Sequence, residues 1–300
     1  KVYFGKAYEE DRDSLFCGMY CALGLELLAR AALAKISPTL LADPGSQKNL
    51  LYSLGLNDAG GKPVSIKTNQ VIKTCGELIA DFNTDLQNVA TLMTELRNEE
   101  LHTGGGGFAE NNPDNWMANF YKACQVLGAS MGETLESLFG REIAQDANQI
   151  IAEDTEKIKK SVLDKISARR KTFEEDMENH PEEMKGLIEG SKKLVLERTY
   201  KGFHKVTCPC CQNEAVIYGK ESITSHDRIE DEIVEVRKDV TANLFLCDVC
   251  KLKLTTYAEL KCAGLPLHYT NTYQYDPTEY FDIDISALQE AGYMEEYSNE

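Results

Sequence analysis

The sequence predicts a mainly α-helical protein that carries a small α+β domain near its C-terminal end. Apolar residues recur three and four positions apart over much of residues 14–179, whereas short strand-like runs surround paired cysteines after residue 202. The chain has 300 residues, of which 42% are hydrophobic, and this is enough for two cores. We therefore expect a helical domain (1–140), a helical arm or connector (141–200), a cysteine-bearing domain (201–270) and an acidic, aromatic tail (271–300).

The first long helix is expected over residues 15–36, with Ser14 as its N-cap and Ser37-Pro38 as its stop. Apolar side chains surround most of this helix, so we expect it to be buried. It is also the most apolar stretch of the chain, but Glu26 and Arg30 near its middle would meet a large penalty in lipid. We therefore expect no membrane contact. No export signal is visible in the sequence, and clustered cysteines after residue 202 indicate a metal site in a reducing compartment, so the expected location is the cytoplasm.

A second long, amphipathic helix is predicted from about Thr68 to the glycine run at 104–107, after a short helix over 48–54. Its apolar stripe alternates spacings of 4 and 3 residues and comprises Cys75, Ile79, Phe82, Leu86, Val89, Met93 and Leu96. The helical pattern resumes after Pro113 and continues, with interruptions, to about Asn179. Residues 151–200 interleave 12 acidic with 11 basic residues, which favours a solvated helical pair acting as a connector.

Strand-like runs over 214–218 and 233–245 accompany two Cys-x-x-Cys pairs. Each pair can offer two thiolates to one tetrahedral ion, which predicts a zinc ribbon with the ligands Cys208, Cys211, Cys247 and Cys250. Four cysteines leave no open coordination position, so the zinc is expected to be structural, and we expect no catalytic metal. The alternative is a set of free or redox thiols in the same reducing compartment.

Several residues near these cysteines have more than one possible role. Cys210 and Cys262 are spare thiols, and His204 lies close enough in sequence to compete as a ligand. The ribbon could touch RNA or a partner through its lysines, although solvated surface charge is the simpler interpretation; these lysines are Lys205, Lys220, Lys251 and Lys253. The net charge of −17 excludes a broadly basic nucleic-acid clamp but leaves room for a local RNA site.

The end of the second long helix holds an unusual pair of residues. Arg97 lies beside the apolar stripe, so it needs either an internal salt bridge or a bound phosphate. His102 falls on the opposite side of an ideal helix, but the glycine run after it could let the imidazole swing back toward the same cleft. The similar spacing of Arg198 and His204 is interpreted as coincidence, because it lacks the Asn that follows Arg97.

The segment from Arg97 through Asn98 to His102 resembles the Arg-x-x-x-x-His motif of HEPN-superfamily ribonucleases, and residues 23–33 are similar to the early HEPN helix. The resemblance covers about residues 10–140 and implies a HEPN-like helical bundle that forms a homodimer. By this resemblance, Arg97 and His102 from two chains would be the catalytic pair, and RNA would be cut through its 2′-hydroxyl without a metal. Asn98 would orient the pair, and Glu26 would hold Arg97 or His102, or instead pair with Arg30.

Proteins of this family act as toxins or antiphage effectors, so an antitoxin or a phage-derived activator is a conceivable partner. The rival interpretations are a non-catalytic HEPN scaffold that binds nucleotide or a partner protein, and a zinc-ribbon interaction protein whose helical half dimerises. The tail has eight acidic residues and no Lys or Arg in 271–300. It either covers a cleft as a nucleic-acid mimic or forms an acidic surface strand and terminal helix on the ribbon.

Overall fold

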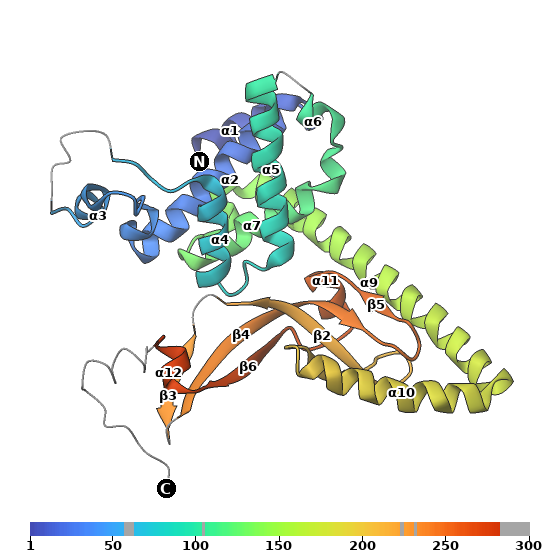
Figure 1. The fold of residues 1–300 in the computed structure, drawn as a ribbon. Helices are drawn as coiled ribbons and strands as arrows, with labels where there is room; N and C mark the ends of the chain where they lie inside the picture. The colour runs from blue at the N-terminus through green and yellow to red at the C-terminus, as the bar shows by residue number, and fades with distance from the viewer. Residues whose placement is uncertain (57–62, 104–105, 223–224, 231–232, 283–300) are drawn as a thin grey trace, which may run out of the picture.

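The computed structural model describes residues 1–56, 63–103, 106–222, 225–230 and 233–282. It is mostly helical with one small antiparallel sheet, as predicted. The helices of residues 2–139 form a bundle, the sheet lies beside it, and the long helix α9 (Arg141–Asn179) joins the two bodies (Figure 1). Each body has its own hydrophobic core.

Helix α2 (Leu15–Ile36) is the central helix of the bundle and packs against α1 (Val2–Glu9), α5 (Thr84–Thr103) and α7 (Met117–Ser130). The Ser14 hydroxyl accepts from the Phe16 amide at 3.2 Å, which confirms the predicted N-cap. By length and composition α2 is apolar enough to cross a membrane, but half of its most apolar 18-residue window is buried inside the protein. A core helix of a bundle has this same property.

The predicted second long helix is in fact two helices, α4 (Thr68–Leu78) and α5 (Thr84–Thr103). The side-chain oxygen of Asn83 accepts from the amides of Asp85 (3.0 Å) and Leu86 (3.3 Å), so Asn83 ends the turn and starts α5. The apolar stripe is nevertheless correct, because all seven of its residues are buried. The turn between the two helices keeps Ile79 and Phe82 in the core. The spacing of three and four residues between buried side chains therefore continues across the turn and did not reveal the break.

The remaining helices of the bundle are short. They are α3 (Gln47–Ser53), α6 (Gly107–Glu110) and α8 (Leu135–Phe139), with 3₁₀ turns at Pro38–Leu41 and Pro113–Asn115. Gly107 begins α6, so the glycine run does not exclude helix at its last position, while 104–105 lie outside the described residues. In the core of the bundle, the ring of Phe120 packs edge to face on the rings of Phe4, Trp116 and Phe139.

Helices α9 (Arg141–Asn179) and α10 (Pro181–Thr199) form the predicted helical pair, with Pro181 at the first position of α10. Their interpretation as a solvated connector is wrong for their inner faces. Ala147 at the start of α9 belongs to the core of the bundle, and Ile166 further along belongs to the core of the sheet. Val195 of α10 is also buried, so the arm is a structural part of both bodies.

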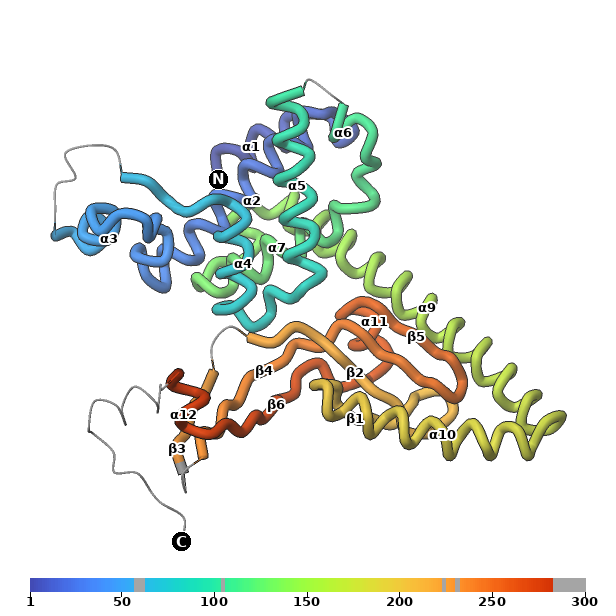
Figure 2. Tube along the Cα trace, in the orientation of Figure 1, coloured from blue at the N-terminus to red at the C-terminus, as the bar shows by residue number. Residues whose placement is uncertain are grey.

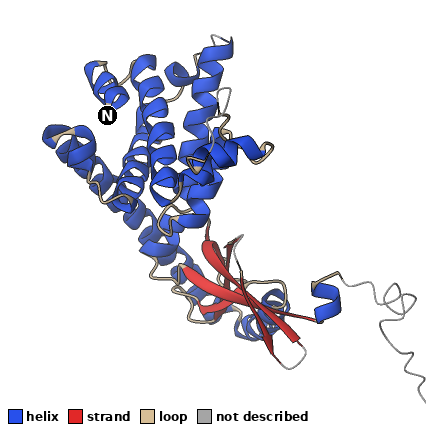
Figure 3. Cartoon of the chain, turned by 90° about the vertical axis from the view of Figure 1, so that its left-hand side faces the viewer, coloured by secondary structure: helices blue, strands red, loops and turns tan. Residues whose placement is uncertain are grey.

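The sheet is antiparallel throughout and is built around the 14-residue strand β4 (Ile233–Leu246). One edge of β4 pairs with β2 (Glu214–Glu221) and β3 (His226–Glu230), and β2 also pairs with β1 (His204–Thr207). The other edge pairs with β5 (Lys253–Leu254) and β6 (His268–Tyr275). Helix α11 (Tyr257–Cys262) connects β5 to β6 and packs on α9. Figure 2 follows this path by colour, and Figure 3 shows the strands below the bundle.

The acidic, aromatic tail starts inside a strand. The expected boundary at 271 falls within β6, which pairs with β4 from His268 to Tyr275, and α12 (Pro277–Tyr280) follows. The Tyr273 hydroxyl bonds to Glu221 of β2, and the Tyr280 hydroxyl bonds to Asp227 of β3. Residues 271–281 are therefore a surface strand and short helix on the sheet rather than a cover over a cleft. The rest of the tail, 283–300, lies outside the described residues.

Candidate metal centre and the Arg97 cluster

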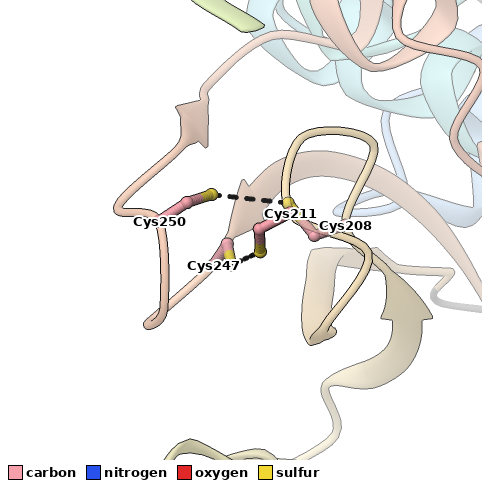
Figure 4. A group of neighbouring side chains, drawn as sticks. All are labelled: Cys208, Cys211, Cys247 and Cys250. Atoms are coloured by element: carbon pink, nitrogen blue, oxygen red, sulfur yellow. Dashed lines mark hydrogen bonds between the residues drawn. The ribbon is translucent and has the colours of Figure 1, made fainter. Parts of the chain in front are cut away.

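The two Cys-x-x-Cys turns meet at one end of the sheet. Cys208 and Cys211 lie between β1 and β2, while Cys247 and Cys250 lie between β4 and β5. The four sulfur atoms lie within 4.8 Å of one another, and the pairs Cys208–Cys250 and Cys211–Cys247 are each 3.6 Å apart (Figure 4). All four side chains are buried, so the structure brings the predicted ligands together.

Both turns have the same backbone shape. The residue after the second cysteine is left-handed in each, with φ of 59° at Gln212 and 57° at Lys251. The amide of the first cysteine donates to the carbonyl five residues later in each turn, Cys208 to Asn213 at 2.9 Å and Cys247 to Leu252 at 3.0 Å. Two equivalent turns therefore present two sulfurs each to a common point.

This donor set fits one tetrahedral metal ion. Metal–sulfur distances of about 2.3 Å place the sulfurs of such a site about 3.8 Å apart, which agrees with the observed cluster. Hydrogen bonds among the thiols, above all between Cys208 and Cys211, lower the pKa of Cys211 and raise the pKa of Cys208. Since the thiols compete for negative charge, only a bound cation lets all four ionise together. The four cysteines can thus hold a structural metal ion.

The surrounding residues hold the turns in place and are not ligands. Arg198 of α10 forms a two-pronged salt bridge with Asp248 of the second turn, which gives it a structural role. The spare thiol Cys210 donates to a backbone carbonyl of α9, and the ring of His204 stacks on Tyr269 at 5.0 Å between centroids. Among the described residues, the cluster consists of the four predicted cysteines, without His204 and without Cys262.

The second candidate site is a group of charged side chains between α2, α4 and α5. Glu26 of α2 forms salt bridges with Arg97 of α5 and with Arg30 one turn further along α2, the latter at 3.0 Å. Thr68 of α4 donates its hydroxyl to the same carboxylate at 2.7 Å. Glu26 was expected to hold Arg97 or else to pair with Arg30, and in the structure the one carboxylate does both. We call Glu26, Arg30, Thr68 and Arg97 the Arg97 cluster.

The Arg97 cluster is mostly shielded from water. The exposed fractions of the side chains are 12% for Arg97, 16% for Glu26 and 20% for Arg30. Burial alone would raise the pKa of Glu26, but hydrogen bonds from Thr68 and Arg97 outweigh it and hold this pKa below its usual value. The cluster thus contains two cations for one carboxylate and has a net positive charge at neutral pH.

His102 does not join this cluster within one chain. Helix α5 continues through Thr103, so the expected swing of the imidazole back toward Arg97 is wrong. Five residues along an α-helix place His102 about 140° around the axis from Arg97. The imidazole is exposed, and Asn98 accepts from the guanidinium of Arg97 at 2.9 Å. Any joint action of Arg97 and His102 therefore requires residues from two chains.

Two contacts made by residues of the Arg97 cluster were not predicted from the sequence. Thr68 was expected only as a helix start, and its bond to Glu26 depends on the packing of α4 on α2. The guanidinium of Arg30 also donates to the Ile66 carbonyl at 3.2 Å, which fixes the segment before α4. The i, i+4 spacing of Glu26 and Arg30 predicted only the pair between these two residues, and nothing in the sequence signalled the contacts of Thr68 and Ile66.

Comparison with known proteins supplies no relative, because no protein-family model, curated protein or solved structure matches the chain. The metal centre has a defined donor set, while the Arg97 cluster has a defined charge and a nearby exposed imidazole.

Proposed function

We propose that this chain is a metal-independent endoribonuclease of the HEPN type, which acts as a homodimer and carries a structural zinc ion. The observation that supports the proposal most is the positively charged Arg97 cluster, which lies one and a half helical turns before the exposed His102. Glu26 holds the guanidinium of Arg97 at a fixed place on the bundle, while Asn98 orients it from the other side.

The chemistry of this pair suits RNA. A guanidinium binds the scissile phosphate and stabilises the charge that builds in the transition state. The partner subunit's His102 takes the proton from the RNA 2′-hydroxyl, whose oxygen attacks the phosphorus. The bond to the 5′-oxygen breaks, the leaving oxygen takes up a proton, and the product is a 2′,3′-cyclic phosphate. No step needs a metal ion at this site.

The four-cysteine centre has a separate role in this proposal. Four thiolates close the coordination shell of zinc, so the ion would stabilise the fold of the sheet and take no part in cleavage. A cytoplasmic antiphage effector or toxin is the biological role that fits such an enzyme, with an antitoxin or a phage-derived activator as its regulator.

One observation favours a second candidate function. Each nitrogen of the Arg97 guanidinium already donates to Glu26 or Asn98, so this arginine has a structural role in the bundle even without a substrate phosphate. A scaffold that uses the HEPN-like bundle and the zinc ribbon to bind a nucleotide or a partner protein would keep this arrangement without catalysis.

Cleavage of total cellular RNA in EDTA by the wild-type protein and by His102→Ala separates the two functions. We expect wild-type cleavage with cyclic phosphate ends, and at least a hundredfold loss in His102→Ala. His226→Ala is the matched control, because it removes an exposed imidazole on β3 of the sheet. Fluorescence of the buried Trp116 in every sample verifies that the bundle keeps its fold, and zinc content of about one per chain before EDTA is added does so for the sheet domain. Equal cleavage by His102→Ala and wild type would refute the nuclease, and the absence of cleavage in every sample would favour the scaffold.

A further inference from the structure

A basic cavity lies between helix α9 and strand β5, beside the second cysteine turn. Its volume is about 410 Å³, and four of its seven lining residues are cationic while none is acidic. The lining residues are Lys165, Ala168, Arg169, Thr172, Lys251, Leu252 and Lys253. A cavity of this composition is unusual in a chain whose net charge is −17. We call it the basic cavity.

Most of this charge is not neutralised by the protein. Lys165 pairs with Glu259, but within the ranges that the structure describes, no ion pair involves Arg169, Lys251 or Lys253. All four cationic side chains are exposed. Like charges gathered without carboxylates repel one another, so the cavity favours an anionic occupant.

The structure also separates the lysines that the sequence had grouped together. Lys205 pairs with Glu214 of β2 at 3.0 Å, and Lys220 pairs with Glu77 of α4 at 3.3 Å, so a carboxylate neutralises each of these two lysines. Lys251 and Lys253 instead face α9, where residues 157–171 hold seven basic residues and one acidic residue. The charge of the cavity is therefore continuous with a basic stretch of the helix.

Hydrogen bonds and turn geometry hold the backbone of both walls of the cavity in place. Lys165, Arg169 and Thr172 are spaced by four and three residues, so they share one face of α9 over about 10 Å. The neighbouring Arg170 donates to the carbonyls of Pro209 (3.0 Å) and Cys210 (3.3 Å), which ties the helix to the first cysteine turn. On the opposite wall, the left-handed backbone at Lys251 is part of the second cysteine turn. The metal centre thus preorganises both walls.

We propose that the basic cavity binds the phosphate backbone of RNA at an anchoring site separate from the Arg97 cluster. The choice of RNA rests on the proposed function, whereas the anionic character of the ligand rests on the cavity itself. A guanidinium, three ammonium groups and a hydroxyl are phosphate ligands. The lining has no aromatic side chain and no large exposed apolar one, so it offers neither a surface for stacking bases nor an anchor for a protein partner. The site therefore binds backbone without reading sequence.

Fluorescence anisotropy of a fluorescein-labelled 12-nucleotide oligouridylate tests this proposal. All proteins carry His102→Ala, so that the probe stays intact, and binding is measured from 50 to 300 mM KCl. The cavity variant adds Arg169→Gln and Lys253→Gln. The matched control adds Lys185→Gln and Lys192→Gln on α10, whose ammonium groups are exposed and pair with glutamates on their own helix.

We expect the cavity variant to bind at least roughly fivefold more weakly at 100 mM salt, and its slope of log K against log salt to fall by about 1.4, because each phosphate contact on a single strand contributes about 0.7. The control should bind like the parent protein. Equal binding by cavity variant and parent, or an equal loss in the control, overturns the proposal. Labelled polyglutamate serves as a second probe in the same assay. If the cavity variant loses binding to polyglutamate but not to RNA, the proposal is overturned in favour of an acidic protein partner.

This experiment is independent of cleavage. If wild-type protein cuts no RNA but the cavity variant loses binding, the proposed nuclease fails while the anchoring site stands. If wild-type protein cuts RNA and the cavity variant binds normally, the nuclease stands and the anchoring site fails. Zinc content and far-UV circular dichroism of each variant confirm that the metal centre beside the cavity is intact.

Discussion

Replacing Glu26 with Gln removes the one carboxylate that two arginines share. The side chain keeps its size, but Arg30 and Arg97, which are 20% and 12% exposed, then face each other without a counter-charge. A charge-assisted hydrogen bond contributes about 1.5–3 kcal/mol, and two such bonds are affected. The amide oxygen of Gln still accepts one bond and water screens the partly exposed groups, so we expect a loss of about 2–3 kcal/mol. This corresponds to roughly 5–10 °C in Tm for a domain of this size.

The dependence on pH follows from the lowered pKa of Glu26. Although burial opposes ionisation, hydrogen bonds from Thr68 and Arg97 keep the folded-state pKa below the unfolded value of about 4.3. A lowered pKa means that the carboxylate stabilises the fold fully above the unfolded pKa and loses this effect as the pH falls through the folded pKa. The stability difference between wild type and Glu26→Gln should therefore be constant from pH 7 to about 5.5 and shrink in more acidic solution.

The assay is urea unfolding followed by tryptophan fluorescence. Trp116 is the single tryptophan of the chain and is 2% exposed in the core of the bundle, so it reports the body that contains Glu26. Glu95→Gln is the control, because Glu95 is an exposed carboxylate on α5 that forms no ion pair among the described residues. A loss below about 0.5 kcal/mol in Glu26→Gln, or an equal loss in the control, would contradict the reasoning about a shared, shielded carboxylate.

Three further changes have defined outcomes. Cys250→Ser should lower zinc content from about one per chain to near zero and abolish cooperative unfolding of the sheet in calorimetry; full zinc occupancy would contradict the four-thiolate site. Gly219→Ala should cost at least about 2 kcal/mol by urea unfolding followed by far-UV circular dichroism, because an added Cβ would lie 1.9 Å from the Thr241 carbonyl oxygen across the bulge; a neutral effect would exclude this close approach. Ser14→Ala should cost about 1 kcal/mol by Trp116 fluorescence, as expected for a lost N-cap, and no loss would mean that the cap is dispensable.

The parts of the fold that the sequence predicted are the ones that local chemistry decides. The Ser14 hydroxyl caps α2 as expected, and each Cys-x-x-Cys pair forms a turn whose two thiols meet those of the other pair, because these features depend on residues only a few positions apart. The break at Asn83 was missed because the turn preserves the 3–4 spacing of buried residues across it. Spacing reports which side chains are buried and says nothing of the backbone path between them.

Several contacts could not be predicted from the sequence, and all of them depend on packing between segments that are far apart in the chain. Thr68 reaches Glu26 across 42 residues, and Lys220 reaches Glu77 across the gap between the sheet and the bundle. Charge composition alone made α9 look like a solvated connector, because a helix that spans two bodies needs only a few buried positions in each. Which lysines are neutralised is likewise a property of the folded chain.

Helix α9 makes the state of the metal centre relevant to the rest of the molecule. About 27 Å of helix separates Ala147 in the core of the bundle from Lys165 in the basic cavity, and the helix runs through this distance without a break. Its far half is held by packing on the sheet and by the bonds of Arg170 to the first cysteine turn, so these contacts would depend on an ion bound by the four cysteines. Its first turns, around Ala144 and Ala147, are held by the core of the bundle. Loss of the ion should therefore remove the basic cavity while leaving Trp116 buried, because the contacts that form the cavity and those that bury the indole lie on opposite ends of one helix.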